Sequence, residues 1–426
     1  MDFRDLIARK RDGGALAPEE WERFVAGVTA GKLPKYQLAA FLMAAYIRGL
    51  NDDEVAALTR AMAASGTQLR WGPGPYVDKH STGGVGDAVT LVAAPWAAAC
   101  GARVPKLSGR GLSFTGGTID KLGAIPGIKL TYDAAAFAAL VDRVGWAVAE
   151  ATALAPADKV LYALRDATAT VGAVPLIVAS IMSKKVAAGA PGLVFDVKCG
   201  RGAFAADEKT ARDLAGRLVQ MATAFDRKAV AVITAMDQPL GYAVGNALEV
   251  EGAAAALEGK GAPDLVAVAR AVAAEMLAVA GVAVEGRAED LLTRALETGR
   301  AYAKFDEMAR AQGADADWRA RLPRAAYQYD VRANATGTLT RLDAYGVAKA
   351  AAALGAARAT VEDALDASAG VVLVKKEGDD VKAGECVMTL HYNDARRLEA
   401  AVAYAKEALT VGEEAEPRPL IIDILR

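Results

Sequence analysis

The sequence is poor in cysteine and histidine, the residues of disulfide frameworks and of many metal sites. Its 426 residues include three cysteines, Cys100, Cys199 and Cys386, and two histidines, His80 and His391. The cysteines stand too far apart for a disulfide framework or a zinc site, so we expect small buried thiols in a reducing compartment. A fold held together by disulfides or by structural zinc is therefore excluded.

Long apolar runs and a strong net charge are also lacking. The longest uncharged stretch, from Ala88 to Ala102, is too short to cross a membrane and contains Pro95 and Gly101, so we expect a buried helix. The N-terminus carries charges from Asp2 onward and lacks the apolar core of a signal peptide. The net charge of -2 gives no sign of the basic face of a nucleic-acid-binding protein. We expect a cytoplasmic protein that acts on a small molecule, without membrane or nucleic-acid partners.

The residues that are present predict an α/β protein of two or three domains, because 426 residues exceed one ordinary core. Apolar residues recur at helical spacing over residues 2–10, 18–31 and 36–48. Asn51–Glu54 has the pattern of a capping box and opens a fourth helix that ends at Gly66. The glycines and prolines of Trp71–Pro75 then predict a linker.

After this linker, short β-rich runs alternate with alanine-rich helices, which predicts a largely parallel sheet covered by helices. The expected strands are residues 76–78, 103–107, 193–197 and 229–234. From about Ala335 the pattern changes to strands and turns, at residues 370–378 and 386–391. A C-terminal α+β domain therefore completes the predicted fold.

Two glycine-rich segments each follow a predicted strand. Residues 79–87, KHSTGGVGD, combine a lysine and two hydroxyls with three glycines, whose backbone N–H groups can approach an anion closely. The spacing fits neither a Walker loop nor a dinucleotide-binding loop, and a plain strand–helix turn is the alternative. Residues 108–121, SGRGLSFTGGTIDK, offer further donors. Loops after parallel strands meet at the carboxyl edge of the sheet, so we expect an anion site there, the alternative being two unrelated loops.

These segments resemble the thymidine and pyrimidine-nucleoside phosphorylase family. Residues 108–121 are similar to the family signature, and further segments are similar in family order: 79–87, 161–166 (LYALRD), 180–185 (SIMSKK), 196–204 (DVKCGRGAF) and 238–246 (QPLGYAVGN). The resemblance covers nearly the whole chain. It implies phosphorolysis, in which inorganic phosphate cuts the bond between a pyrimidine base and its sugar.

The resemblance also implies a domain plan and a homodimer. A helical domain is built from residues 1–69 and 158–190, an α/β domain from residues 70–157 and 191–334, and an α+β domain from residues 335–426. Phosphate is the co-substrate and belongs to the α/β domain, the base belongs to the helical domain, and no organic cofactor is implied.

Site residues are carried over one by one from this resemblance. Lys79 is the main cation for phosphate, and His80, Arg165 and Lys184 share the catalytic work at the base. The residues implied to bind phosphate are Lys79, His80, Ser81, Thr90, Lys106, Leu107, Ser108 and Thr118. Those implied to bind the nucleoside are His80, Leu112, Arg165, Ile177, Ser180, Lys184 and Phe204. Turn-capping hydroxyls, core packing and surface ion pairs are the alternatives for single members.

Lys106 and several departures bear on specificity. Broader members of the family tend to have Lys at position 106 and thymidine-restricted members Met, which favours uridine as well as thymidine; a salt bridge at a strand end is the alternative. Ser113 and Phe114 replace the usual Gly-His, and Gly123 replaces Glu. The resemblance further implies K+ bound through backbone oxygens of Gly86, Ala88, Leu240 and Ala243, while the carboxylate position of that site is Gly252, next to Glu251.

Three rival functions remain. A thymidine-restricted phosphorylase is the nearest. A phosphoribosyltransferase of the anthranilate type shares the domain plan, but it needs acidic metal-binding motifs, which we do not find. A non-catalytic nucleoside-binding relative is suggested by the changes at residues 114 and 123. It is opposed by the presence of the residues Lys79, Arg165, Ser180 and Lys184.

Overall fold

A computed structural model describes residues 2–111, 116–151, 153–283, 286–358 and 364–426. The chain forms two compact units. The helical unit comprises residues 1–74, 151–191 and 216–229, and the α/β unit comprises residues 75–150, 192–215 and 230–426. The helical unit therefore also takes a third segment, residues 216–229, which the sequence assigned to the α/β domain.

The helical unit is built around an aromatic core. Trp21 and Phe24 of α2 and Phe41 of α3 are buried, and their ring centroids lie 4.8 to 5.7 Å apart. The expected capping box is confirmed, since Asn51 and Glu54 exchange side-chain to backbone hydrogen bonds at the start of α4. The helices of this unit are α1 (Phe3–Arg11), α2 (Pro18–Thr29), α3 (Lys35–Arg48), α4 (Asp52–Ala64), α8 (Pro156–Ala167), α9 (Val174–Ala188) and the second half of α10 (Glu208–Ala224).

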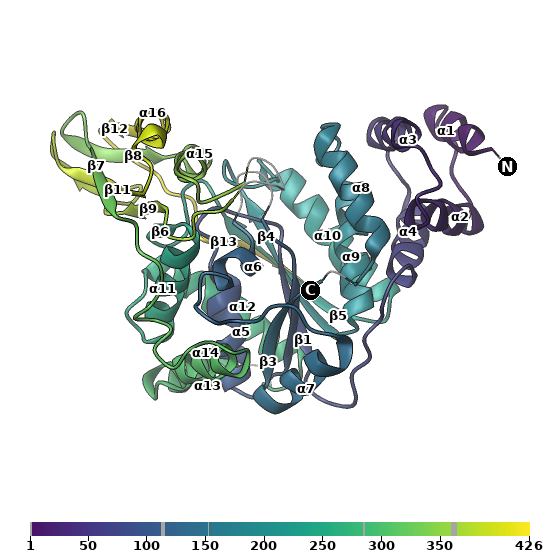
Figure 1. The fold of residues 1–426 in the computed structure, drawn as a ribbon, viewed down its shortest axis with the longest axis horizontal. Coiled ribbons are helices and arrows are strands. Elements are labelled where there is room, and N and C mark those ends of the chain that lie inside the picture. Colours follow the sequence, from purple (N-terminus) through teal and green to yellow (C-terminus); the bar gives the residue numbers. More distant parts are fainter. Residues whose placement is uncertain (1, 112–115, 152, 284–285, 359–363) are drawn as a thin grey trace. The chain divides into compact units, whose positions relative to one another are not determined.

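The main sheet of the α/β unit has the strand order β1-β4-β5-β13 (Figure 1). These strands are β1 (Val77–Ser81), β4 (Gly192–Cys199), β5 (Lys228–Ala235) and β13 (Ile421–Leu425). β1 and β4 are parallel, as are β2 (Val104–Ser108) and β3 (Trp146–Glu150), and a parallel bridge from Tyr76 to Arg103 links the two pairs. The prediction of a largely parallel sheet is confirmed. β13 pairs antiparallel with β5, an edge strand that the sequence did not indicate.

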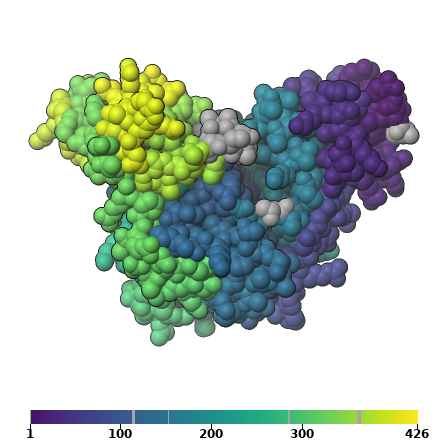
Figure 2. Space-filling view, viewed as in Figure 1, coloured from purple at the N-terminus to yellow at the C-terminus, as the bar shows by residue number. Residues whose placement is uncertain are grey.

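The stretch from Ala88 to Ala102 does contain the expected buried helix. Every residue of α5 (Val89–Ala99) is buried, because α5 lies beneath α12 (Pro263–Val279) and α14 (Arg300–Ala311). The remaining helices here are α6 (Thr118–Leu122), α7 (Ala134–Val144), α11 (Asn246–Leu257) and α13 (Ala288–Glu297). In Figure 2 the green residues around α14 adjoin the blue residues around α7, although more than 150 positions separate them. Over the residues that are described, no helix is long and apolar enough to cross a membrane.

The C-terminal part, residues 335–426, contributes most of the strands of two small sheets, in line with the strands and turns predicted there. One has the order β6-β9-β11-β7 and the other β10-β8-β12. Their strands are β6 (Ala243–Val244), β7 (Tyr327–Arg332), β8 (Gly337–Leu342), β9 (Gly370–Leu373), β10 (Asp380–Val381), β11 (Cys386–Tyr392) and β12 (Leu409–Gly412). Two helices, α15 (Ala344–Leu354) and α16 (Leu398–Glu407), and the short η1 (Ala395–Arg397) accompany them. Because β6 pairs with β9, the segment around residue 240 is tied to the C-terminal part.

Candidate active site

The end of β1 places Lys79 in a buried ion pair. Strand alternation puts Lys79 and Ser81 on one face, and the register sets Ser81 opposite Asp196 of β4. The Lys79 ammonium has no solvent contact, lies 2.9 Å from Asp196 Oδ2 and donates to Thr90 Oγ1 at 3.3 Å. A buried ammonium is tolerated only with such partners, so this lysine is held in place by the fold.

Asp87 gathers the donors of the first glycine-rich segment. Ser81 Oγ donates to Asp87 Oδ2 at 2.5 Å, and the backbone N–H of Val89 donates to Oδ1 at 3.2 Å. Burial alone would raise the pKa of the Asp87 carboxyl. The positive charges of Lys198, Lys79 and Lys121 outweigh burial and hold this pKa well below its ordinary value of 3.8. Asp87 therefore stays ionised at neutral pH.

Two further lysines extend this network. Lys198 Nζ lies 2.9 Å from Asp196 Oδ1 and 3.7 Å from Asp87 Oδ1. Lys121 Nζ lies 2.6 Å from a carboxylate oxygen of Glu249 and donates to the Asp87 carbonyl at 2.7 Å. Burial raises the pKa of the Glu249 carboxyl, against the effect of Lys121. The result is a buried network of lysines and carboxylates along the carboxyl edge of β1 and β4.

Among these charged residues, only Lys79 was predicted from the sequence as a site residue. Asp196 and Lys198 could have been found, because they stand two positions apart on a strand and therefore share a face with each other. Asp87, Lys121 and Glu249 carry no such local signal. Their partners lie far away in the sequence, so only the folded chain brings them together.

Gly86 shows why the first segment needs glycine. Its φ is +64°, and a Cβ atom there would lie 2.4 Å from the carbonyl oxygen of Leu240. No side chain fits so close to a backbone oxygen. Gly83 N donates to Ser81 Oγ at 3.2 Å, so the serine hydroxyl also holds the turn.

The second glycine-rich segment follows β2. Ser108 is the last residue of β2 and Thr118 is the first residue of α6, and both are half-buried. Thr90 and Leu107 are buried, and His80 lies half-buried on β1 between Lys79 and Ser81. Leu112, assigned to the base, and the departures at Ser113 and Phe114 lie outside the described residues.

Lys106 bonds to the protein itself. It is buried, donates to the Lys79 carbonyl at 2.7 Å and lies 3.8 Å from Asp78. These contacts fit the alternative interpretation of Lys106, a salt bridge at a strand end. The same ammonium helps to fix the backbone of Lys79.

A second set of predicted residues meets in the helical unit. Ser180 and Lys184 share a face of α9, and Lys184 Nζ donates to Ser180 Oγ at 3.1 Å. Both also bind the buried Asp158 of α8, Ser180 through a 3.0 Å hydrogen bond and Lys184 through an ion pair. Asp158 was not predicted from the sequence. Its position three residues into a helix that begins with proline predicts only a favourable first-turn acid.

Arg165 is buried and directed at the backbone between α8 and α9. Its guanidinium donates to the carbonyls of Thr170, Val171 and Leu176 at 3.4, 2.6 and 3.1 Å. Burial lowers the pKa of this guanidinium. The alternative for Arg165 was a surface ion pair with Asp166 or another acid; in the described part of the chain its buried guanidinium instead donates to three backbone carbonyls.

The apolar residues assigned to the base have different environments. Ile177 is half-buried on α9, one residue after Leu176. Phe204 lies in the turn after β4 and is 41% exposed. An exposed phenyl ring is not part of a hydrophobic core, so core packing is excluded for Phe204.

Two of the backbone oxygens assigned to K+, those of Leu240 and Ala243, lie close to Gly86. The carbonyls of Leu240 and Ala243 approach Gly86, at 2.4 and 2.9 Å from the position of a Cβ. Lys376 holds this segment, since its ammonium donates to the Gly241 carbonyl at 2.9 Å and lies 2.8 Å from Asp264. These carbonyls suit K+, which prefers oxygen ligands. Among the described residues, no group of three or more His, Cys, Asp or Glu side chains could hold a metal ion.

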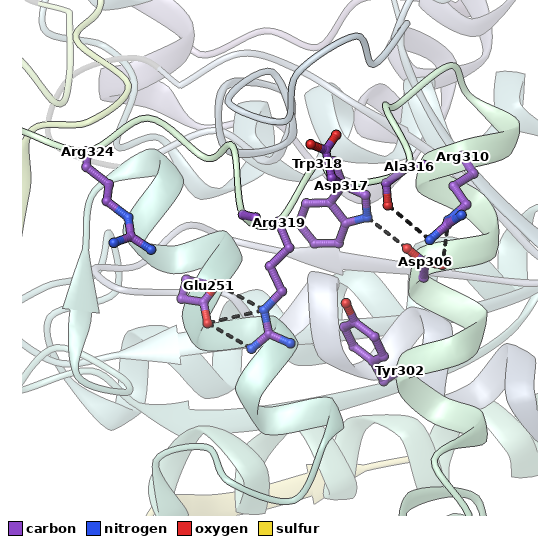
Figure 3. A pocket seen from close by; sticks show the side chains of 10 residues that line it. Glu251, Tyr302, Asp306, Arg310, Ala316, Asp317, Trp318, Arg319 and Arg324 are labelled. Atoms are coloured by element: carbon purple, nitrogen blue, oxygen red, sulfur yellow. Dashed lines mark hydrogen bonds and ion pairs between the residues drawn. The ribbon is translucent and has the colours of Figure 1, made fainter.

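Glu251 does not replace the missing carboxylate. Its oxygens accept from Arg319 at 2.8, 3.1 and 3.2 Å, at the wall of a cavity of about 500 Å³ (Figure 3). Gly252 instead faces Ala243, and a Cβ there would stand 3.9 Å from the Ala243 Cβ. Neighbouring helix positions diverge by about 100°, so the acid at 251 cannot serve position 252. Space for a side chain is present at Gly252, but the carboxylate is not.

Comparison with known proteins identifies relatives over the full length. Residues 4–66 match the helical bundle domain of a glycosyl transferase family, residues 73–302 its a/b domain, and residues 338–412 the pyrimidine nucleoside phosphorylase C-terminal domain. The proteins named pyrimidine-nucleoside phosphorylase from Staphylococcus aureus strains USA300 and bovine RF122 are 44% and 43% identical, with both chains fully covered.

Among solved structures, the anthranilate phosphoribosyltransferase of Thermus thermophilus is similar in fold. The TM-score is 0.60 at 21% sequence identity, and the match covers 73% of this chain and 99% of that one. At this identity the likeness concerns the fold alone.

Proposed function

The chain belongs to the pyrimidine-nucleoside phosphorylase family, and on that premise we propose that it catalyses the reversible phosphorolysis of pyrimidine nucleosides. The products are the free base and ribose or deoxyribose 1-phosphate. The observation that carries the proposal is full-length identity of 44% in a chain that keeps Lys79, Arg165, Ser180 and Lys184 in ordered, buried or half-buried positions. A thymidine-restricted enzyme and a non-catalytic binding protein are the alternatives.

Phosphate is assigned to the Lys79 network. Within the described residues, the Lys79 ammonium donates to Thr90 and forms an ion pair with Asp196, and the proposal gives a further ammonium hydrogen to a phosphate oxygen. Hydroxyls of Ser108 and Thr118 add neutral donors, whereas the Ser81 hydroxyl donates to Asp87 and holds the first glycine-rich segment. A preorganised cation in a water-poor site stabilises a dianion more strongly than a solvated lysine does.

The base is assigned to Ser180 and Lys184. In phosphorolysis the departing pyrimidine gains negative charge, which a nearby ammonium stabilises. Asp158 balances the charge of Lys184 and takes the hydroxyl hydrogen of Ser180, so Ser180 Oγ serves the base as an acceptor. Arg165 donates to the backbone carbonyls of Val171 and Leu176 near the start of α9, and these bonds fix its guanidinium. The proposal gives its remaining N–H groups to the base.

The direct test follows base release by ultraviolet absorbance with uridine or thymidine, with and without inorganic phosphate. Release of both bases only when phosphate is present establishes the broad phosphorylase. Release from thymidine alone keeps the chemistry and removes the broad specificity. No release from either nucleoside, in a protein with a cooperative unfolding transition, favours the binding protein.

Broad specificity is supported by the names of the full-length relatives, which are pyrimidine-nucleoside rather than thymidine phosphorylases. Lys106 supports it only indirectly, because its ammonium bonds the Lys79 carbonyl. We therefore propose that uridine, deoxyuridine and thymidine are all substrates.

We also propose that K+ binds through the carbonyls beside Gly86, without a carboxylate ligand. The Leu240 and Ala243 oxygens support this part of the site, whereas Gly252 supplies nothing and Glu251 is held by Arg319. No catalytic step is assigned to the ion, since its ligand set is incomplete.

Finally, we propose a cytoplasmic homodimer. Cys100, Cys199 and Cys386 are thiols, which suits a reducing compartment. On α3, the large apolar residues Tyr36 and Ile47 are 74% and 69% exposed, and Met43 lies on the same helical face. An exposed apolar stripe of this kind is typical of a subunit interface.

A further inference from the structure

The two ends of the second glycine-rich segment touch each other. A Cβ atom on Gly117 would lie 2.1 Å from the backbone nitrogen of Gly111 and 2.5 Å from the carbonyl carbon of Arg110. Only glycine permits so close an approach of two backbone segments. We call this close approach of Gly117 to Arg110 and Gly111 the neck of the segment. Ser108 lies three residues before Gly111, and Thr118 directly follows Gly117.

A single buried carboxylate holds this neck. Asp120 stands on α6, two residues after Thr118, and its Oδ2 accepts from the Gly111 N–H at 2.7 Å. The next residue, Lys121, donates to the Asp87 carbonyl in the first glycine-rich segment at 2.7 Å. Two consecutive side chains thus fix both segments to which phosphate is assigned.

The C-terminal part supplies the counter-ion of Asp120. Arg358, four residues after the end of α15, donates to Asp120 Oδ1 at 2.9 Å, and its side chain is only 15% exposed. Arg110 also approaches Oδ1, but at 3.5 Å, and it is 56% exposed. Arg358 therefore provides the closer and better shielded charge.

A buried carboxylate beside a phosphate site is unfavourable unless its charge is neutralised. Without Arg358, the negative charge of Asp120 would repel a bound dianion across a medium of low dielectric constant. The same loss would also remove one of the hydrogen bonds that orient the Asp120 carboxylate, which accepts from the Gly111 N–H.

We propose that Asp120 and Arg358 are positioning residues for phosphate, and that the C-terminal part acts on the reaction through this ion pair. The proposal rests on the proposed phosphorolysis. Neither side chain is assigned a contact with substrate; Arg358 neutralises and orients Asp120, and Asp120 sets the neck between Ser108 and Thr118.

The test compares Arg358→Gln with Arg358→Lys in steady-state kinetics. Loss of one charged hydrogen bond in a partly buried site should raise the KM for phosphate about tenfold in Arg358→Gln, with the KM for the nucleoside unchanged. Arg358→Lys should recover part of this loss, because it restores the charge. Arg396→Ala removes an exposed arginine of the same C-terminal part and should match the wild type.

A double-mutant cycle with Asp120→Asn tests whether the two residues act together. If they do, Arg358→Gln should cost no more phosphate affinity in the Asp120→Asn background, because the repelling charge is gone. Additive effects, or equal increases of both KM values, overturn the proposal.

Phosphate binding can also be measured without turnover, as the rise of Tm that phosphate causes. A rise that is smaller in Arg358→Gln than in the wild type supports the proposal even if no nucleoside is cleaved. An equal rise in both proteins refutes it. Cleavage by the wild type combined with an equal rise would leave phosphorolysis standing and remove only the role of Arg358.

Discussion

At the residue scale, Lys79 is the side chain to which the proposed function gives the most direct contact with phosphate. Its ammonium is fully buried, and its charge is balanced by Asp196 rather than by water. A lysine in this position keeps its orientation before the ligand arrives, so little reorganisation is needed on binding.

Replacing Lys79 by Ala should therefore lower kcat by about a hundredfold or more, as loss of one preorganised charge-stabilising donor does. The measurement is turnover at saturating phosphate and nucleoside. Lys209→Ala removes an exposed lysine of the same unit and serves as the matched control. Wild-type kinetics in Lys79→Ala would remove Lys79 from the mechanism.

Asp87 should make stability depend on acid pH. Its pKa in the folded protein lies well below the ordinary 3.8, so the unfolded chain takes up a proton first as the pH falls. The stability that Asp87 contributes is thus complete above about pH 4 and is lost progressively below it. Asp87→Asn should be less stable than the wild type at pH 6, and this difference should narrow by pH 3.

Urea unfolding at several pH values measures this effect. Asp290→Asn, an exposed carboxylate, should show little difference at either pH. A gap between wild type and Asp87→Asn that stays constant from pH 6 to pH 3 would contradict the coupling of Asp87 to the lysines.

At the scale of elements, two glutamates of α11 form ion pairs with different partners. Glu249 pairs with Lys121 in the buried network, and Glu251 pairs with Arg319 at the cavity of Figure 3. Gly252 faces Ala243 with room for a side chain. One helix thus contributes to the buried network of lysines and carboxylates and to a peripheral ion pair, and it supplies no carboxylate at the proposed K+ site.

Gly252→Glu should restore that carboxylate and also stabilise α11. Replacing a helical glycine raises the free energy of unfolding by about 0.5 kcal/mol, which urea titration measures. If the carbonyls beside Gly86 bind K+, the variant should gain a larger rise of Tm with K+ than the wild type, with Na+ as the reference salt. A gain in stability with no added response to K+ would contradict the proposed cation site.

At the scale of the whole molecule, the exposed face of α3 predicts assembly. Tyr36, Met43 and Ile47 are apolar, large and exposed on one helix, and a second copy of the chain is the proposed partner. Ile47→Glu should convert the dimer to a monomer, because a buried, unpaired carboxylate at an interface is costly. Sedimentation equilibrium gives the mass directly.

Val374→Glu tests whether any exposed apolar position would have this effect. Val374 is 49% exposed in the C-terminal part, so this variant should remain a dimer. A monomeric wild type, or a dimer that survives Ile47→Glu, would exclude α3 as the interface.

The sequence by itself determined the features that depend on local pattern. Helical spacing predicted α1 to α4, the Asn51–Glu54 pattern predicted a cap that the structure confirms, and the uncharged stretch predicted buried α5. The strand runs gave a largely parallel sheet, with ends within a few residues of those observed. The order of the motifs was enough to indicate the family, because glycine-rich turns and i, i+4 pairs are recognised from short stretches of sequence.

Only the tertiary structure decided which charges meet. Lys121 with Glu249, Lys184 with Asp158 and Arg358 with Asp120 join positions that are 26 to 238 residues apart, and no local pattern marks such pairs. The structure also placed Lys106 on a backbone carbonyl and Glu251 on Arg319. The sequence gives the type of each side chain, whereas its partner and its charge state depend on burial and distance in the folded chain.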